Sequence, residues 1–384
     1  MSFFIYFLLY YFISCSEKDI NEKIYNYTIN NEEPKRKLEN DEYIEINILF
    51  DIREIIKQYN FLSQSSMYEE TVKEIYAVKN FFETFNNPFK KLIKIKKRNK
   101  SKIKISNEAL QVLKSKGDSF NDSLLNEEFG NDLVIFVGLS ESGKNTFDDL
   151  DIIQYDDDNK PTVGFIIYHI PFGKNINDEN QKNQLLNIFF LHETTHILGF
   201  EKTILQNKGL LQPLEIERIK TYKKNVIKNN KIKELIKKYF NCNDIDYIEL
   251  DGSSDEKKKF VHWEGRILLG DYMTSEIYYP EQVISEFTIA VLESLEWYKV
   301  NNYTGGLMKF GKNKGCDFLK KDCAEYKNYM LIPKFNNEFC HSNSFGTCSN
   351  GRQSRGYCFI TESDTEIDTN RYGRNNWITY IILY

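Results

Sequence analysis

The strongest constraint on this chain is the segment at residues 185–200, Leu-Leu-Asn-Ile-Phe-Phe-Leu-His-Glu-Thr-Thr-His-Ile-Leu-Gly-Phe. His192 and His196 are four residues apart, so on a helix both imidazoles lie on one face and can reach a single metal ion. Glu193 lies one position round the helix, close enough to take a proton from a metal-bound water. The apolar residues before His192 predict a buried helix, and Gly199 favours a helix end. The segment therefore predicts a metal site on a rigid helix.

The context of the motif decides between a metal site and a chance match. The chain has only five histidines among its 384 residues. Two of them fall at ligand spacing inside an apolar helical segment. We therefore interpret His192 and His196 as metal ligands and Glu193 as the catalytic base.

A catalytic zinc ion takes three protein ligands and a water molecule. The extended metzincin pattern places the third histidine just after the glycine, but the sequence here reads Gly-Phe-Glu-Lys at residues 199–202. The third ligand must come from elsewhere, and the candidates are a carboxylate or one of His169, His262 and His341. His262 is followed by Met273, and a methionine under the metal is the other half of the metzincin signature.

These motifs together resemble the leishmanolysin family of zinc metallopeptidases. The similarity rests on His-Glu-Thr-Thr-His-Ile-Leu-Gly-Phe, a long insertion, then His-Trp-Glu-x-Arg and Tyr-Met-Thr. It continues through Leu-Glu-Ser-Leu-Glu-Trp-Tyr at residues 292–298 and Gly-Cys-Asp-Phe at residues 315–318, and covers residues 40–360. The resemblance implies one Zn²⁺ ion with His262 as its third ligand, Met273 in the Met-turn, and protein or peptide substrates.

Three other residues have competing interpretations. His169 follows a predicted strand without a methionine beside it, so we interpret it as a strand-end histidine rather than the third ligand. Glu264 and Arg266 flank His262. They are either partners that orient the site or members of a structural ion pair.

The fold class we predict is α+β. A metzincin-like upper subdomain of mixed sheet and helices would span residues 41–200 and carry the active-site helix. Residues 201–275 would contain the insertion, the third ligand and the Met-turn, and residues 276–384 a lower, disulfide-rich and loop-rich subdomain. The apolar patterns predict elements in the following places: strands at residues 43–50, 133–137 and 161–168, an acidic loop at 148–158, and helices at 66–85, 214–240 and 285–297. Because Pro161 suits a strand start or edge, we expect residues 161–168 to form an edge strand that binds extended substrate.

Both ends of the chain point to export. Residues 1–16 form a short apolar run typical of a signal peptide, with a buried N-terminal strand as the alternative. The polar residues 17–40 are compatible with a pro-segment that has a basic cleavage site at residues 34–37. Of seven cysteines, Cys15 falls in the signal, and five of the other six lie in the last quarter. Glycosylation sequons occur at Asn26, Asn99, Asn121 and Asn302. The apolar end at residues 377–384 is too short for a lipid-anchor signal, so no clear membrane anchor is expected, although membrane association is left open.

The sequence therefore favours a secreted or cell-surface zinc metalloendopeptidase, expected to be a monomer. A net charge of −5 argues against a nucleic-acid partner. The alternative is a catalytically silent surface adhesion protein on the same scaffold, which would not need Glu193. A peptidase with a glutamate as third ligand is a further alternative, against which the His-Trp-Glu context counts.

Overall fold

The computed structural model describes residues 42–321 apart from 65–67, 86, 98–101, 141–149, 171–177, 218–220, 252–258, 276–281 and 302–307. Beyond residue 321 it describes the backbone of five strands, one pair and one triplet, and residue 338. The chain divides into two compact units. As far as the chain is described, the first unit comprises residues within 42–201 and 292–303, and the second comprises residues within 202–291 and 304–384.

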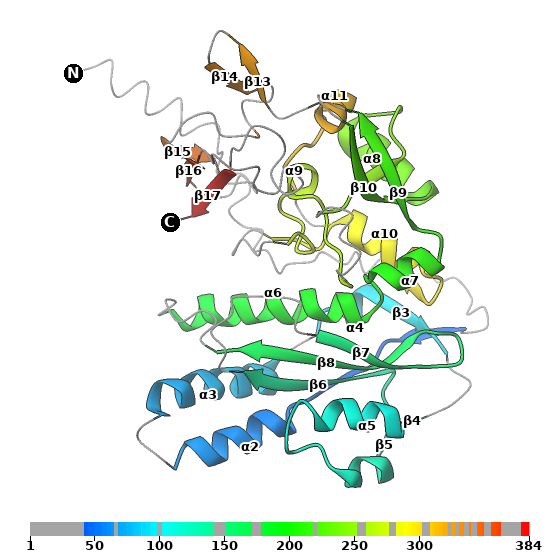
Figure 1. Ribbon diagram of the computed structural model, residues 1–384, viewed down its shortest axis with the longest axis vertical. Coiled ribbons are helices and arrows are strands. Elements are labelled where there is room, and N and C mark those ends of the chain that lie inside the picture. Colours follow the sequence, from blue (N-terminus) through cyan, green and yellow to red (C-terminus); the bar gives the residue numbers. More distant parts are fainter. Residues whose placement is uncertain are drawn as a thin grey trace, which may run out of the picture. The chain divides into compact units, whose positions relative to one another are not determined.

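The first unit is built on a four-stranded mixed sheet with the order β2-β6-β8-β7, of which Figure 1 labels β6, β8 and β7. β2 (Ile48–Asp51), β6 (Leu133–Ser140) and β8 (Pro161–His169) are parallel neighbours, and β7 (Leu150–Tyr155) runs antiparallel to β8. β6 and β8 are buried along most of their length, as strands with both faces covered usually are.

Helices cover both faces of this sheet. On one face, Phe190 of α6 (Glu179–Ile197) packs against Phe81 and Phe82 of α3 (Glu69–Thr84) and against Tyr168 of β8. On the other face, α5 (Asn107–Lys114) contributes to a core cluster that includes Phe136 and Phe165 of the sheet. In Figure 1, α6 and α5 lie on opposite sides of the strands. The apolar cluster fixes α6 against the sheet through aromatic contacts.

Gly164 allows the last turn of α6 to lie directly on β8. A Cβ atom built on Gly164 would meet side-chain atoms of Ile197 at 2.7 Å. Any larger residue would therefore push the end of the helix away from the sheet. The close approach holds the histidine-bearing turn of α6 at a fixed height above the strands.

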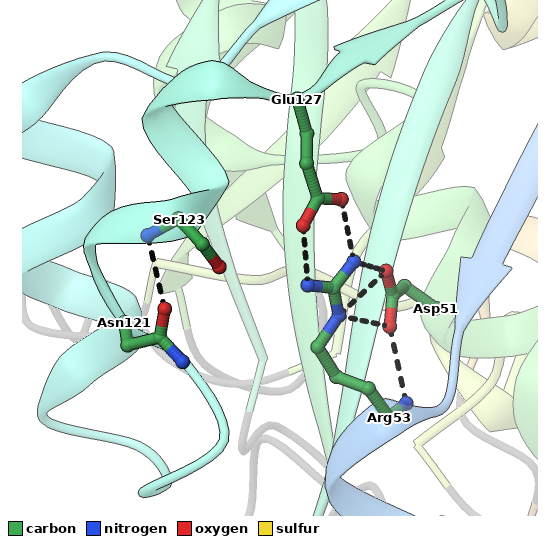
Figure 2. A network of polar contacts seen from close by, with 5 residues as sticks. All are labelled: Asp51, Arg53, Asn121, Ser123 and Glu127. Carbon is green, nitrogen blue, oxygen red and sulfur yellow. Dashed lines mark hydrogen bonds and ion pairs between the residues drawn. The ribbon is translucent and has the colours of Figure 1, made fainter.

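The side chain of Arg53, the first residue of α2 (Arg53–Leu62), links Asp51 at the end of β2 to Glu127. Its guanidinium donates to both carboxylate oxygens of Asp51, at 2.6 to 3.0 Å, and to both of Glu127, at 2.8 Å (Figure 2). The paired bonds match the planar fork of arginine. The side-chain hydrogen bond from Arg53 lowers the pKa of the Glu127 carboxyl below its ordinary value.

A smaller antiparallel sheet in the first unit has the order β1-β3-β12. Its strands are β1 (Tyr43–Glu45), β3 (Ile93–Lys96) and β12 (Tyr298–Val300), with α4 (Phe89–Leu92) preceding β3. β4 (Ile103–Lys104) pairs with β5 (Glu128–Phe129), which follows the 3-10 helix η3 (Asp122–Asn126). The single strand predicted at residues 43–50 is therefore two strands in different sheets, whereas the helix predicted at 66–85 is confirmed as α3.

Two expectations about the main sheet are wrong. β8, predicted to be an edge strand, pairs with β6 on one side and β7 on the other, so its backbone is already bonded on both sides. Pro161 only begins that strand, a position where proline needs no ladder bond. The acidic loop predicted at residues 148–158 contains β7, because Leu150 and Ile152 alternate inward among the acidic residues.

The second unit contains an antiparallel sheet with the order β11-β10-β9. The chain enters it through α7 (Lys202–Asn207), then forms β9 (Leu211–Glu217), β10 (Thr221–Lys228), α8 (Asn230–Phe240) and β11 (Tyr247–Glu249). The helix predicted over residues 214–240 is therefore correct only for its last 11 residues, which form α8. The preceding residues pair as a hairpin, so their apolar spacing reflects strands rather than a helix.

The remaining elements of the second unit are short. α9 (Gly265–Leu268), α10 (Glu286–Ser294) and α11 (Gly315–Lys320) follow β11, with the last residues of α10 belonging to the first unit. α10 confirms the helix predicted at residues 285–297. A disulfide joins Cys242, which is fully buried, to Cys316, so the end of α8 is tied to the start of α11.

Strands complete the described part of the chain. β13 (Ala324–Lys327) pairs with β14 (Met330–Pro333), and β15 (Ser344–Cys348), β16 (Arg355–Thr361) and β17 (Ile378–Leu383) form an antiparallel sheet. The predicted α+β class is confirmed. Among the described residues, no helix combines the length and the apolar character needed to cross a membrane. Residues 1–40, the sequons Asn26, Asn99 and Asn302, and His341 lie outside the described residues.

Candidate metal centre

The first two candidate ligands lie on α6, which is the buried helix that the sequence predicts. The Asp178 side chain caps its start by accepting a hydrogen bond from the backbone N–H of Gln181 at 2.8 Å. From Leu185 onward almost every residue of the helix is buried. A helix that is buried all round has little freedom to tilt or fray, so its side chains are held in fixed positions.

His192 and His196 are buried at 1% and 0% exposure, and their Nε2 atoms lie 3.1 Å apart. Two nitrogens that each lie about 2.0–2.1 Å from one tetrahedral ion are separated by roughly 3.3 Å. The observed spacing of the two imidazoles therefore fits a shared ion of this size.

The tautomer of His196 is set by the chain just after the helix. Its Nδ1 lies 2.8 Å from the carbonyl oxygen of Phe200, and a carbonyl can only accept, so Nδ1 carries the proton. Nε2 then presents its lone pair, which is the form that a metal needs. Burial, together with the nearby His192, lowers the pKa of His196 well below its ordinary value and keeps the ring neutral.

Gly199 allows the chain to turn so that the Phe200 carbonyl reaches His196. Its φ of 122° lies in the positive region that favours glycine, and it turns the chain so that Phe200 comes back beside the helix. The Phe200 N–H donates to the carbonyl of Thr195 at 3.1 Å. The hydroxyl of Tyr298 donates to the carbonyl of Leu198 at 3.0 Å, which holds the end of the helix from a second direction.

Glu193 lies next to His192 on the same helix and is 1% exposed. Its carboxylate is thus carried by the same rigid turns that carry the two imidazoles. A glutamate in this position can serve a proton-transfer role without being a ligand itself.

His262 lies in the second unit on a short extended segment and is 9% exposed. The Asp251 N–H donates to its carbonyl oxygen at 2.8 Å, and the next residue, Trp263, donates its N–H to the carbonyl of Met273 at 2.9 Å. The segment that bears His262 is therefore hydrogen-bonded directly to the segment that bears Met273.

Met273 is fully buried, and its turn is built around Asp271, which is also fully buried. Asp271 Oδ1 accepts from the Met273 N–H at 2.6 Å, and Oδ2 accepts from the Thr288 hydroxyl at 2.8 Å. That hydroxyl in turn accepts the indole N–H of Trp263 at 2.8 Å. A closed set of buried hydrogen bonds thus joins the residue after His262 to the methionine turn.

Among the described residues, His192, His196 and His262 form the group that could hold a metal ion, with ligand atoms all within 4.8 Å of one another. Three imidazoles are a donor set suited to zinc. His169, buried at the end of β8, is not part of this group.

Comparison with known proteins agrees with these features. The leishmanolysin family model matches residues 90–375, which is well over half of the chain. The chain belongs to the leishmanolysin family. Leishmanolysin of Leishmania donovani is 26% identical over 247 residues, covering 63% of this chain and 39% of that protein. The leishmanolysin-like peptidase of Drosophila melanogaster is 27% identical over 137 residues, covering 34% of this chain and 20% of that protein. The chain thus spans well under half the length of these relatives.

Glu264 and Arg266 of this leishmanolysin family member make structural contacts. Glu264 forms an ion pair with Lys224 at 2.6 Å. Arg266 lies 3.4 Å from Glu249 and donates to the carbonyls of Phe318 and Leu319. These contacts agree with the structural ion pairs that the sequence allowed as one interpretation.

Sequence reasoning missed Lys224 and Asp271. Asp271 had a local signal, since an aspartate two residues before Met273 can accept the N–H of that methionine. Lys224 had none, because a lysine on a polar strand normally faces solvent.

Proposed function

We propose that this chain is a zinc metalloendopeptidase that hydrolyses peptide bonds in proteins or peptides. The observation that carries the proposal is the group of His192, His196 and His262, with Glu193 on the same buried helix as the first two. Membership of a peptidase family supports the reaction class. Because the match covers only part of the relatives' length, the activity and substrates are proposed for this chain and not taken over from them.

The proposed ligand set is His192, His196 and His262. The neutral state and fixed tautomer of His196 suit coordination, and its orientation is maintained by the Phe200 carbonyl. Glu264 is the nearest carboxylate in sequence to His262, but its oxygens are not among the ligand atoms that lie within 4.8 Å of one another. This position counts against Glu264 as the third ligand.

Zinc held at these residues would lower the pKa of a water molecule and polarise the scissile carbonyl. Glu193 then accepts the proton of the attacking water and passes it to the leaving amine nitrogen, acting first as base and then as acid. The rigid helix keeps Glu193 and the imidazoles of His192 and His196 in fixed relative positions during the reaction. The Met273 carbonyl accepts the N–H of Trp263 and so helps to fix the segment of His262.

We propose that extended substrate binds along β7, because β8, the strand expected from the sequence, is already paired on both sides. In the described part of the main sheet β2 and β7 are the terminal strands, and β7 is the one next to β8. A terminal strand offers backbone groups to which an extended peptide can add as a further strand, with little dependence on side chains. We infer broad sequence tolerance, with selectivity at one or two positions.

The proposed location is outside the cell, on its surface or in its surroundings. The disulfide between Cys242 and Cys316 supports this proposal, because such bonds persist in oxidising compartments. The apolar run at residues 1–16 is the expected export signal.

Zinc analysis of two histidine variants tests the ligand set. His262→Ala should lose bound zinc and peptidase activity, whereas the matched control His169→Ala should keep zinc near the wild-type content. A chelator should abolish hydrolysis of a mixed peptide library by the wild type, and added zinc should restore it. The reverse order of zinc loss would refute the assignment of His262. A zinc-loaded protein that cleaves no peptide would favour the adhesion alternative.

A further inference from the structure

The segment that bears His262 is held between two backbone partners within the second unit. On one side, Leu250 forms an antiparallel bridge with Trp263, and the Asp251 N–H donates to the His262 carbonyl at 2.8 Å. On the other side, Trp263 bridges to Thr274 and donates to Met273. The backbone at His262 is therefore fixed from both edges.

One of these edges belongs to the insertion between the α6 motif and His262. Leu250 and Asp251 directly continue β11, and Glu249 at the end of β11 pairs with Val226 of β10. The Leu250 N–H donates to the carbonyl of Asn225 at 2.9 Å. The backbone ladder of the β9-β10-β11 sheet thus runs without interruption into the segment of His262.

A buried ion pair reinforces the same junction. Lys224, from β10, places its Nζ 2.6 Å from Oε2 of Glu264, and both side chains are 4% exposed. Glu264 lies two residues after His262, and its N–H donates to the carbonyl of Glu249 at 3.1 Å. Two buried charges are costly unless they face each other in good geometry, so this contact specifies one register between β10 and the His262 segment.

We propose that the insertion sheet positions the third ligand, with Lys224 as the positioning residue that acts through Glu264. The inference rests on the proposed role of His262 as a zinc ligand and goes beyond it, because it assigns a task to the insertion. Lys224 touches neither substrate nor metal in this account. It fixes the backbone two residues from the imidazole, and metal sites require ligand distances within about 0.2 Å.

The expected effect is that of losing a residue that orients a ligand, about 10- to 100-fold in zinc affinity. Lys224→Met removes the positive charge, and Lys224→Arg keeps it. Because Lys224→Met leaves a lone buried carboxylate that can unfold the unit, the double variant Lys224→Met/Glu264→Leu removes both charges and remains testable. The matched control is Lys228→Met, on the same strand, whose pair with Asp246 at 3.0 Å is about 40% exposed.

The experiment measures zinc release to a chromogenic chelator and the visible absorption spectrum of the cobalt(II)-substituted protein, with His262→Ala in parallel. We expect faster zinc release and an altered cobalt spectrum in Lys224→Met and in the double variant. Lys224→Arg should recover most of the wild-type behaviour, and Lys228→Met should match the wild type. The cobalt spectrum reports ligand geometry, which a loss of stability alone would not alter in the folded protein.

Two failures can be told apart. If His262→Ala keeps its zinc, the ligand assignment of the proposed function is wrong, and the positioning role is overturned with it. If His262→Ala loses zinc while the folded double variant has the wild-type release rate and cobalt spectrum, the positioning role alone is overturned.

Discussion

Asp271 offers a quantitative test of the buried hydrogen-bond network that joins Trp263 to the turn of Met273. Its side chain accepts hydrogen bonds from the Met273 N–H at 2.6 Å, the Thr288 hydroxyl at 2.8 Å and the Ser285 N–H at 3.3 Å. Burial nevertheless raises the pKa of the Asp271 carboxyl from 3.8 to about 6. The perturbation is Asp271→Asn, which keeps the size of the side chain and removes its titration.

The sign and size of the effect follow from the two pKa values. Between pH 3.8 and about 6 the folded protein binds more protons at Asp271 than the unfolded chain does, so stability falls as pH rises. The contribution is fully present below pH 3.8 and is lost as pH rises through about 6. A shift of about two pKa units corresponds to roughly 3 kcal/mol. Asparagine lacks this dependence, although it loses an acceptor at a cost of about 1–3 kcal/mol.

The assay is urea unfolding of wild type and Asp271→Asn at several pH values between about 4 and 7. A chelator is present throughout, so that loss of metal at low pH affects neither curve. The stability of the wild type relative to the variant should fall by roughly 3 kcal/mol across this range. Parallel stability curves would show that Asp271 titrates normally and would refute the account of its burial.

Three other predictions concern the scaffold. Arg53→Met should lower the free energy of unfolding by about 1–3 kcal/mol. Because Arg53 holds the pKa of Glu127 low, this difference should be full at neutral pH and shrink below about pH 4.5, as denaturation at pH 7 and pH 3 would show. Replacing both Cys242 and Cys316 by alanine should cost about 2–4 kcal/mol in the same assay, and an unchanged midpoint would contradict it. In protein secreted by a glycosylating host, Asn121→Gln should remove one glycan from the intact mass. Asn121 is exposed and its Oδ1 accepts from the Ser123 N–H, which leaves its amide nitrogen available (Figure 2).

The fold was predictable where local pattern and tertiary environment agree. The run at residues 133–137 and the helix of residues 285–297 are apolar in the way their buried positions require. The position of β8 was not predictable from Pro161, because the place of a strand in its sheet depends on which strands lie beside it. The nearly continuous burial of β8 is what a central strand shows, and its apolar run was the better signal.

The candidate site likewise has a part that the sequence predicts and a part that it does not. The α6 residues share one helix, so their spacing alone brings His192 and His196 together. The support for His262 comes from residues distant in sequence, such as Lys224 and Asp251. Residues of this kind leave no local pattern, because a buried ion pair is defined by the partner that the fold supplies. Local pattern was also insufficient in the insertion, where the apolar spacing predicts a helix over residues 214–240 and the structure has the β9-β10 hairpin before α8.

The most direct test of the central claim is the rate of peptide hydrolysis by zinc-loaded Glu193→Gln. Zinc content is measured on the same sample, and it should equal that of the wild type because Glu193 is proposed to move a proton and not to bind the ion. With the proton acceptor removed, turnover should fall by about 10²-fold or more, in line with the contribution of a positioned general base. A variant that holds one zinc ion and cleaves peptides at near wild-type turnover would contradict the account.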